Sequence, residues 1–100
     1  MLPLIILTGP TNSGKSDTAL ALARKLDTEI ISADSLQVYK YFDIGTAKPS
    51  AAAREEIPHH LIDILEPDQE FNAFDFKTQA LKIIHELRDR DKIPILVGGT

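Results

Sequence analysis

Eight consecutive residues near the start of the chain have the types and spacing of a phosphate-binding loop. They match the pattern G-x-x-x-x-G-K-[ST] and are Gly9, Pro10, Thr11, Asn12, Ser13, Gly14, Lys15 and Ser16. The two glycines allow backbone conformations in which successive N–H groups point at an anion. Lys15 supplies a mobile positive charge for terminal phosphate oxygens, and the Ser16 hydroxyl is suited to ligate Mg²⁺. The pattern therefore predicts a site for a diphosphate or a triphosphate.

The segments on either side of this loop are the ones that such a loop requires. Residues 4–7 are apolar and largely β-branched, as in a buried strand. Residues 18–26 are rich in strong helix formers, with Leu22 and Leu26 one turn apart. A helix that starts at the end of the loop adds its positive dipole end to the anion site. The alternative, a chance match in a glycine-bearing turn, does not explain both flanks.

Asp34 is the second residue with a chemical interpretation. It follows a second predicted strand, residues 29–33, and open α/β sheets bind ligands at the carboxyl ends of their strands. There it would either hold Mg²⁺ through water or act as a general base toward an attacking nucleophile. The structural alternative is an aspartate that caps the next turn. A further predicted strand, residues 95–97, ends in Gly98 instead of an acid, so only Asp34 supplies a carboxylate at a strand end.

The rest of the chain predicts an α/β fold of the P-loop NTPase-like type, a partial doubly wound parallel sheet with flanking helices. Residues 35–49 are polar and irregular, Ser50 caps a short helix, and residues 60–65 fit either a strand or a turn. Asn72 caps a long amphipathic helix that ends in a solvated charged cluster, residues 88–92. Its apolar face consists of Phe76, Ala80, Ile83, Ile84 and Leu87.

The last predicted strand suggests that residues 1–100 are the N-terminal portion of a larger core domain. In a doubly wound fold, the glycine turn after such a strand leads into another helix that covers the sheet. No residues follow Thr100 here, so one face of this strand is expected to lack its cover. The rest of the same protein beyond Thr100 is therefore an expected partner of this segment.

Composition indicates a globular piece of a cytoplasmic enzyme. Of its residues 43% are hydrophobic and 26% charged, with no cysteine. We expect no membrane association, because no apolar run approaches the length of a membrane span and the first residues lack a signal peptide's basic region. The net charge is −4 without a basic stripe, so a surface for nucleic acid would have to lie elsewhere.

Several other side chains admit two interpretations. His59 and His60 with Asp63 resemble a metal site in type, but adjacent histidines on a strand point in opposite directions, which favours a structural role. Tyr39 and Tyr41 suit base stacking and core packing equally well.

Seven stretches, taken together and in order, resemble the tRNA dimethylallyltransferase family. The most specific is Asp-Ile-Gly-Thr-Ala-Lys-Pro at residues 43–49, which ordinary kinases and GTPases lack. The resemblance runs over essentially the whole chain but over only the N-terminal third of a family member. The other six stretches are residues 9–11, 13–16, 33–35, 37–39, 58–63 and 96–100.

This resemblance implies the transfer of a dimethylallyl group from dimethylallyl diphosphate to N6 of the tRNA adenosine 3′ of the anticodon, with release of pyrophosphate. The loop would then hold a prenyl diphosphate rather than ATP, with Lys15 and Mg²⁺ at Ser16 stabilising the leaving group. Asp34 would be the general base, and Thr100 would place a hydroxyl at the reacting centre. The implied contacts to the extruded base are Asp34, Ser35, Leu36, Gln37 and Thr100.

Two other functions remain open at this point. One is a small-molecule kinase that uses ATP in the same loop, with Asp34 contacting the acceptor hydroxyl. The other is a non-catalytic nucleotide-binding module. Ligand preference distinguishes them, because a prenyltransferase binds dimethylallyl diphosphate and a kinase prefers ATP. Under every one of these interpretations, we expect residues 1–100 by themselves to be inactive on tRNA.

Overall fold

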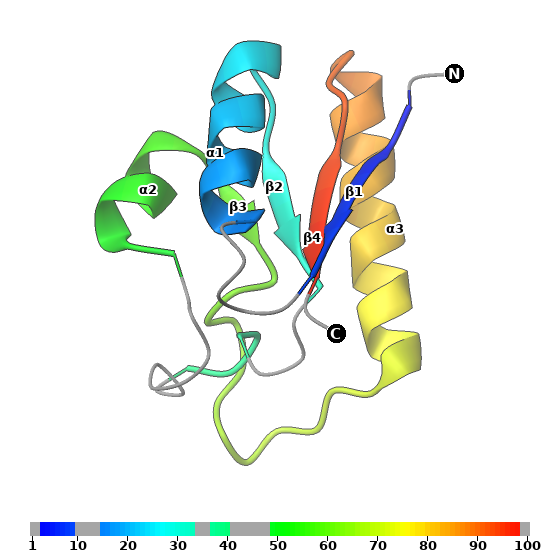
Figure 1. Cartoon of the computed structure of the whole chain (residues 1–100). Helices are drawn as coiled ribbons and strands as arrows, with labels where there is room; N and C mark the ends of the chain where they lie inside the picture. The colour runs from blue at the N-terminus through cyan, green and yellow to red at the C-terminus, as the bar shows by residue number, and fades with distance from the viewer. Residues whose placement is uncertain (1–2, 10–14, 34–36, 41–48, 99–100) are drawn as a thin grey trace.

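Strands and helices alternate along the chain, as the sequence predicts (Figure 1). The computed structural model describes residues 3–9, 15–33, 37–40 and 49–98. In chain order the elements are β1 (Ile5–Thr8), α1 (Lys15–Leu26), β2 (Ile30–Ser32), α2 (Ala51–Glu56), β3 (His59–His60), α3 (Ala73–Asp89) and β4 (Ile95–Gly98). No helix within these residues is long and apolar enough to cross a membrane.

The described strands form one parallel sheet in the order β1-β4-β2-β3. Ile95 of β4 is in register with Ile5 of β1 on one side and with Ile30 of β2 on the other. β2 follows β1 in the chain but is not its neighbour in the sheet, because β4 lies between them. This is the parallel α/β sheet with flanking helices that the sequence predicts.

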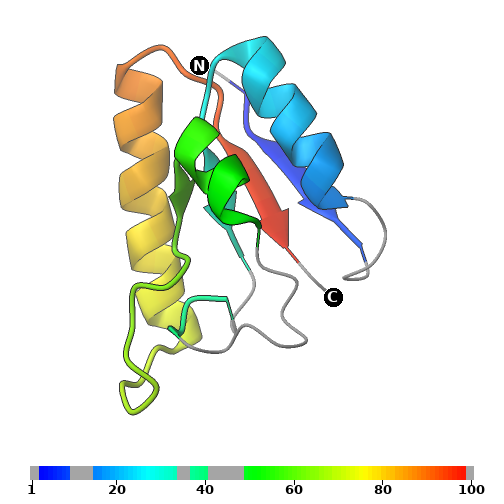
Figure 2. The ribbon, with the colours of Figure 1, turned by 90° about the vertical axis from the view of Figure 1, so that its left-hand side faces the viewer.

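The helices cover both faces of the sheet. α1 and α3 lie on opposite sides of the strands (Figure 2). Right-handed connections produce this arrangement, because the chain crosses the sheet in one direction through α1 and returns through α3. The cluster on the α1 side consists of Ala19, Ala23, Ile30, Ile57 and Ile95. The cluster on the α3 side consists of Ile31, Leu61, Ala80, Ile84 and Leu87.

The last strand has more cover than was expected from the sequence, although its cover is incomplete. β4 lies inside the sheet, Ile95 is fully buried beneath α1, and Leu96 packs against the cluster beneath α3. The physical reason is the strand order, which brings β4 between two strands that already carry helices. On the α3 side of the sheet Leu96 is half-buried, and its register partner Ile6 on β1 is 57% exposed.

The face that α1 presents to the sheet is made of small residues. Ala19 and Ala23 are almost completely buried, whereas Leu22 is only partly buried. Small side chains at one-turn spacing let the helix backbone approach the strands closely. The two leucines that marked this helix in the sequence are therefore not its most deeply buried residues.

Both predicted helix caps are confirmed. The Ser50 hydroxyl accepts a hydrogen bond from the Ala53 N–H at the start of α2, with 3.1 Å between the atoms. Asn72 and Asp75 form a capping box on α3, in which Asn72 Oδ1 accepts from the Asp75 N–H at 2.9 Å. The Asn72 N–H donates in return to Asp75 Oδ2 at 3.1 Å. These contacts fix where the long helix begins.

The charged cluster after α3 does more than face solvent. Asp91 adopts a left-handed conformation, φ 58°, and the following Lys92 N–H donates to the Leu87 carbonyl at 2.9 Å, as in a Schellman motif. Lys92 Nζ also reaches Asp27, which ends α1 in the same conformation, and lies 3.0 Å from its Oδ2. The prediction of a merely solvated helix end was therefore incomplete, because this cluster ties α3 to the turn after α1.

Candidate functional site

The candidate site lies at the edge of the sheet where the parallel strands end. β1 ends at Thr8, β2 at Ser32 and β4 at Gly98, and the three arrowheads converge in the lower half of Figure 1. Open α/β sheets bind their ligands at this edge, near the point where the strand order reverses. Every site residue predicted from the sequence belongs to a segment that adjoins one of these three ends.

A strand and a helix flank the predicted phosphate loop, as such a loop requires. Gly9 has a φ of 149°, a conformation that side chains disfavour, directly after β1. α1 begins at Lys15, so its positive dipole end lies at the end of the loop. Of Lys15 only the backbone is described. The loop residues outside the described part are Pro10, Thr11, Asn12, Ser13 and Gly14.

Ser16 is placed where a magnesium ligand of such a loop would be. It lies in the first turn of α1 and is exposed. Among the described residues there is no group of three histidine, cysteine, aspartate or glutamate side chains that could hold a metal ion. A hydroxyl at this position is compatible with the predicted role as a ligand of Mg²⁺ bound to phosphates, an ion that usually keeps several waters.

Asp34, Ser35, Leu36 and Thr100 lie outside the described residues, but the strand ends that lead to them are neighbours. The Ala33 N–H donates to the Val97 carbonyl of β4 at 2.7 Å. At Gly98, a Cβ would lie 3.1 Å from the Cβ of Ala33, so the two chain segments approach each other closely. Ala33, which precedes Asp34 in the chain, and Gly98, which lies two residues before Thr100, are therefore neighbours in the structure.

Gln37 is held at the other end of the segment that contains Asp34. The Ser32 hydroxyl donates to Gln37 Oε1 at 2.9 Å, and Ser32 is itself buried. The Asp63 N–H donates to the Gln37 carbonyl at 3.0 Å. Residues 37–40 therefore run beside residues 63–65, and Tyr39 forms a parallel bridge with Leu65.

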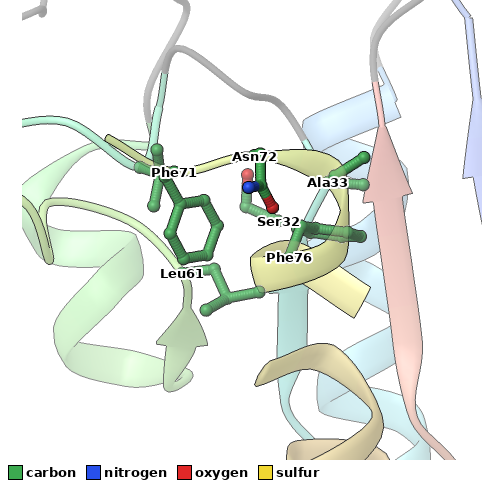
Figure 3. A pocket seen from close by; sticks show the side chains of 8 residues that line it. Ser32, Ala33, Leu61, Phe71, Asn72 and Phe76 are labelled. Carbon is green, nitrogen blue, oxygen red and sulfur yellow. The ribbon is translucent and has the colours of Figure 1, made fainter. Parts of the chain in front are cut away.

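A cavity of about 260 Å³ lies beside these segments and was not predicted from the sequence. It opens between the end of β2 and the first turn of α3 (Figure 3). Most of its wall is apolar or aromatic. The lining residues are Ser32, Ala33, Val38, Leu61, Phe71, Asn72, Ala73 and Phe76. Their positions come from four separate segments, so no local pattern in the sequence marks them as a group.

The two adjacent histidines have separate contacts. His59 Nδ1–H donates to the Ile57 carbonyl at 2.6 Å, and burial lowers the pKa of His59. His60 Nε2 lies 2.7 Å from Glu29 Oε1, and Arg90 contacts the other oxygen of Glu29 at 2.8 Å. Burial alone would raise the pKa of Glu29, but the hydrogen bonds from His60 and Arg90 outweigh it and lower this pKa. These contacts link β3, α3 and the turn before β2.

Comparison with known proteins gives a consistent set of relatives. The family model of IPP transferase matches residues 37–100. A tRNA dimethylallyltransferase of Carboxydothermus hydrogenoformans is 56% identical over 97 residues, which are 97% of this chain and 31% of the relative. One from Pelotomaculum thermopropionicum is 52% identical over 98 residues, 98% of this chain and 31% of the relative. This chain therefore spans about a third of the length of the curated relatives it matches.

Solved structures agree with the sequence comparison. The tRNA isopentenylpyrophosphate transferase of Staphylococcus epidermidis superposes with a TM-score of 0.94 at 49% identity, over all of this chain and 33% of that protein. A eukaryotic dimethylallyltransferase acting on tRNA superposes with a TM-score of 0.92 at 38% identity, over 98% of this chain and 24% of that protein.

Proposed function

The chain belongs to the IPP transferase family, and from this membership we propose that the protein carrying it is a tRNA dimethylallyltransferase. It would move a dimethylallyl group from dimethylallyl diphosphate to N6 of the adenosine 3′ of the anticodon. The observation that carries the proposal is the match of the IPP transferase family model to residues 37–100. The positive φ of Gly9, between a parallel strand and the start of α1 at Lys15, supports a diphosphate site. That arrangement suits a diphosphate leaving group.

The proposed reaction is a substitution at the first carbon of the prenyl group. The lone pair of N6 forms the new carbon–nitrogen bond while the bond from that carbon to the diphosphate oxygen breaks. The proton of N6 passes to Asp34 as general base, and pyrophosphate leaves with the bonding electron pair. We assign the hydroxyl of Thr100 to the reacting centre, beside the diphosphate and the base.

The leaving group needs compensation for the charge that grows on it. Lys15 and the backbone N–H groups from Gly9 to Ser16 would supply it by donating hydrogen bonds to the diphosphate oxygens. Bound Mg²⁺, with Ser16 as its protein ligand, would add positive charge at the same oxygens. The acceptor base has to leave its stack so that N6 becomes accessible, and we assign its contacts to Asp34, Ser35, Leu36, Gln37 and Thr100.

The variant Lys15→Ala in the full-length enzyme tests the phosphate assignment. A cation facing a leaving group contributes roughly 3 kcal/mol, so the transfer rate should fall about a hundredfold while the fold is retained. Pyrophosphate affinity should fall as well. Lys25→Ala is the matched control, because Lys25 is an exposed lysine in the last turn of the same helix. Transfer at the parental rate by Lys15→Ala would refute the assignment.

Ligand preference separates this proposal from the kinase alternative. The protein should bind dimethylallyl diphosphate more tightly than ATP in equilibrium titrations with Mg²⁺ present. The family membership and the relatives above favour the prenyltransferase and do not favour the kinase. A clear preference for ATP, with phosphate transfer to a small molecule, would reverse that order.

A further inference from the structure

A turn of residues 61–63 follows β3 and is joined to α2 by an ion pair between Arg54 and Asp63. Neither of these two residues is among those assigned to the diphosphate or to the acceptor base. We infer that their ion pair positions Gln37, one of the proposed contacts to the acceptor base, from outside the site. The inference rests on the proposed function and adds two positioning residues to it.

The backbone of this turn is strained. Leu61 and Asp63 both adopt left-handed conformations, with φ values of 65° and 55°. Such conformations are rare for leucine, whereas aspartate tolerates them better. They persist where the surrounding contacts determine them. Burial of Leu61 and Ile62 anchors the start of the turn, and the contacts of Asp63 hold its end.

Arg54 supplies a charged contact to Asp63. Its Nη1 donates a hydrogen bond to Asp63 Oδ2 at 2.8 Å. The two side chains are 33% and 28% exposed, so water and salt screen this pair less than a fully exposed one. Arg54 is itself fixed in α2, since its N–H donates to the Ser50 carbonyl at 3.1 Å and Ser50 caps that helix. The helix therefore holds the guanidinium in place beside the turn.

The turn restrains the backbone of Gln37 directly. The Asp63 N–H donates to the Gln37 carbonyl at 3.0 Å. Further along the same two segments, the Lys40 N–H donates to the Leu65 carbonyl at 2.8 Å. Asp63 thus contacts Arg54 through its carboxylate and Gln37 through its N–H. Loss of the ion pair would remove one restraint on Asp63, and the position of the Gln37 backbone would be less well defined.

The side-chain amide of Gln37 depends on the position of that backbone. Its Oε1 accepts a hydrogen bond from the hydroxyl of Ser32 at 2.9 Å, and Ser32 is buried in β2. An amide whose oxygen is bound to a fixed donor presents its NH₂ group in a defined direction. This orientation is kept only while the backbone of Gln37 stays within reach of Ser32. The ion pair and Ser32 therefore act on the same amide, one through the backbone and the other through the side chain.

Steady-state transfer by the full-length enzyme tests the ion pair. Asp63→Asn keeps the size of the side chain and the tolerance for a left-handed backbone but removes the charge. The kcat/KM for tRNA should fall about tenfold, as expected for the loss of a hydrogen bond between charged groups, while KM for dimethylallyl diphosphate stays unchanged. Arg54→Gln should have the same effect, and Arg54→Lys should restore part of the loss. Arg24→Gln is the matched control and should change neither constant, because Arg24 pairs with Glu56 of α2 at 2.7 Å and connects that helix to α1 instead of to the turn.

A double-mutant cycle with Gln37→Ala separates positioning from a general loss of structure. In that background Asp63→Asn should lower kcat/KM for tRNA no further, because the amide through which it acts is gone. Parental kinetics in Asp63→Asn, or the same loss in both backgrounds, would overturn the inference. A Gln37→Ala variant that transfers like the parent, or a matching loss of affinity for dimethylallyl diphosphate in Asp63→Asn, would overturn it as well. The proposed function fails separately, when the parental enzyme transfers no dimethylallyl group to tRNA.

Discussion

At the scale of single residues, the ends of β4 and β2 meet at two small residues, Gly98 and Ala33. The Cβ that an alanine at position 98 would carry lies 3.1 Å from the Cβ of Ala33. This distance is tighter than ordinary contact, so one of the two segments would have to shift by a few tenths of an ångström. Because Asp34 follows Ala33 in the chain, such a shift would reach the proposed general base.

Gly98→Ala should therefore destabilise the protein and slow transfer. Overpacking of this kind typically costs roughly 1–3 kcal/mol, and we expect the lower half of that range in urea unfolding. Ala33→Gly removes the Cβ that is contacted. The cost of Gly98→Ala should thus be smaller in an Ala33→Gly background, and equal costs in both backgrounds would contradict the proposed contact.

Asp34 has two proposed roles that one variant separates. As a general base, Asp34→Asn should lower the transfer rate by roughly 10²–10⁴ while diphosphate affinity hardly changes. As a holder of Mg²⁺, the same variant should also weaken diphosphate binding in the presence of the metal. Single-turnover transfer and equilibrium titration with dimethylallyl diphosphate, made on one preparation, distinguish the two. A large loss of affinity would reject the role of base.

At the scale of elements, the sequence predicted what is encoded locally. The strand before Gly9, the cap at Asn72 and the apolar stripe along α3 depend on neighbouring residues and were correct. The strand order could not be read in this way, because nothing near residues 95–98 says which strands β4 joins. Residues 60–65 remained open between strand and turn. In the structure only His60 of this segment belongs to a strand, β3, and a bend follows at residues 61–63.

Three further features of the structure were not predicted from the sequence: the buried face of α1, the cavity and the contact between Lys92 and Asp27. The buried face of α1 consists of Ala19 and Ala23, and small residues carry little hydrophobic signal beside leucines. The cavity is built from residues 32–33, 38, 61 and 71–76, which only the folded chain brings together. Lys92 contacts Asp27 across 65 positions of sequence, so the charged cluster after α3 gave no indication of its partner.

β3 gives the protein a pH-dependent contribution to stability. Burial lowers the pKa of His59 below its ordinary value of 6.5, although the bond to the Ile57 carbonyl opposes this. The unfolded chain therefore takes up a proton at a higher pH than the folded chain does. It follows that this contribution is complete above about pH 6.5 and is lost as the pH falls through the folded pKa.

Urea unfolding between pH 5 and pH 8 tests this linkage. The free energy of unfolding should decline below about pH 6.5, and His59→Gln should flatten that decline while lowering stability at pH 8. His85→Gln is the control, because His85 is exposed on α3 and should leave the slope unchanged. An unaltered slope in His59→Gln would show that other groups control the pH dependence.

At the scale of the whole molecule, charge limits what residues 1–100 can do. Their net charge is −4, and tRNA binding depends on cations that neutralise phosphates. The chain also spans only about a third of its relatives' length. Under the proposed function, the predicted phosphate loop would supply the diphosphate site, while a basic surface for the RNA backbone would have to come from outside these residues.

Residues 1–100 by themselves should accordingly show no prenylation of tRNA. Transfer requires the extruded base to be held in line with the prenyl carbon, and RNA that is repelled cannot be positioned in this way. A weak, Mg²⁺-dependent affinity for pyrophosphate should remain, because it needs only the loop and the start of α1. Calorimetric titration with pyrophosphate and a transfer assay with radiolabelled dimethylallyl diphosphate measure the two properties. Robust prenylation by this chain alone would mean that its own surface holds tRNA despite the negative charge, and the requirement for a separate basic surface would be wrong.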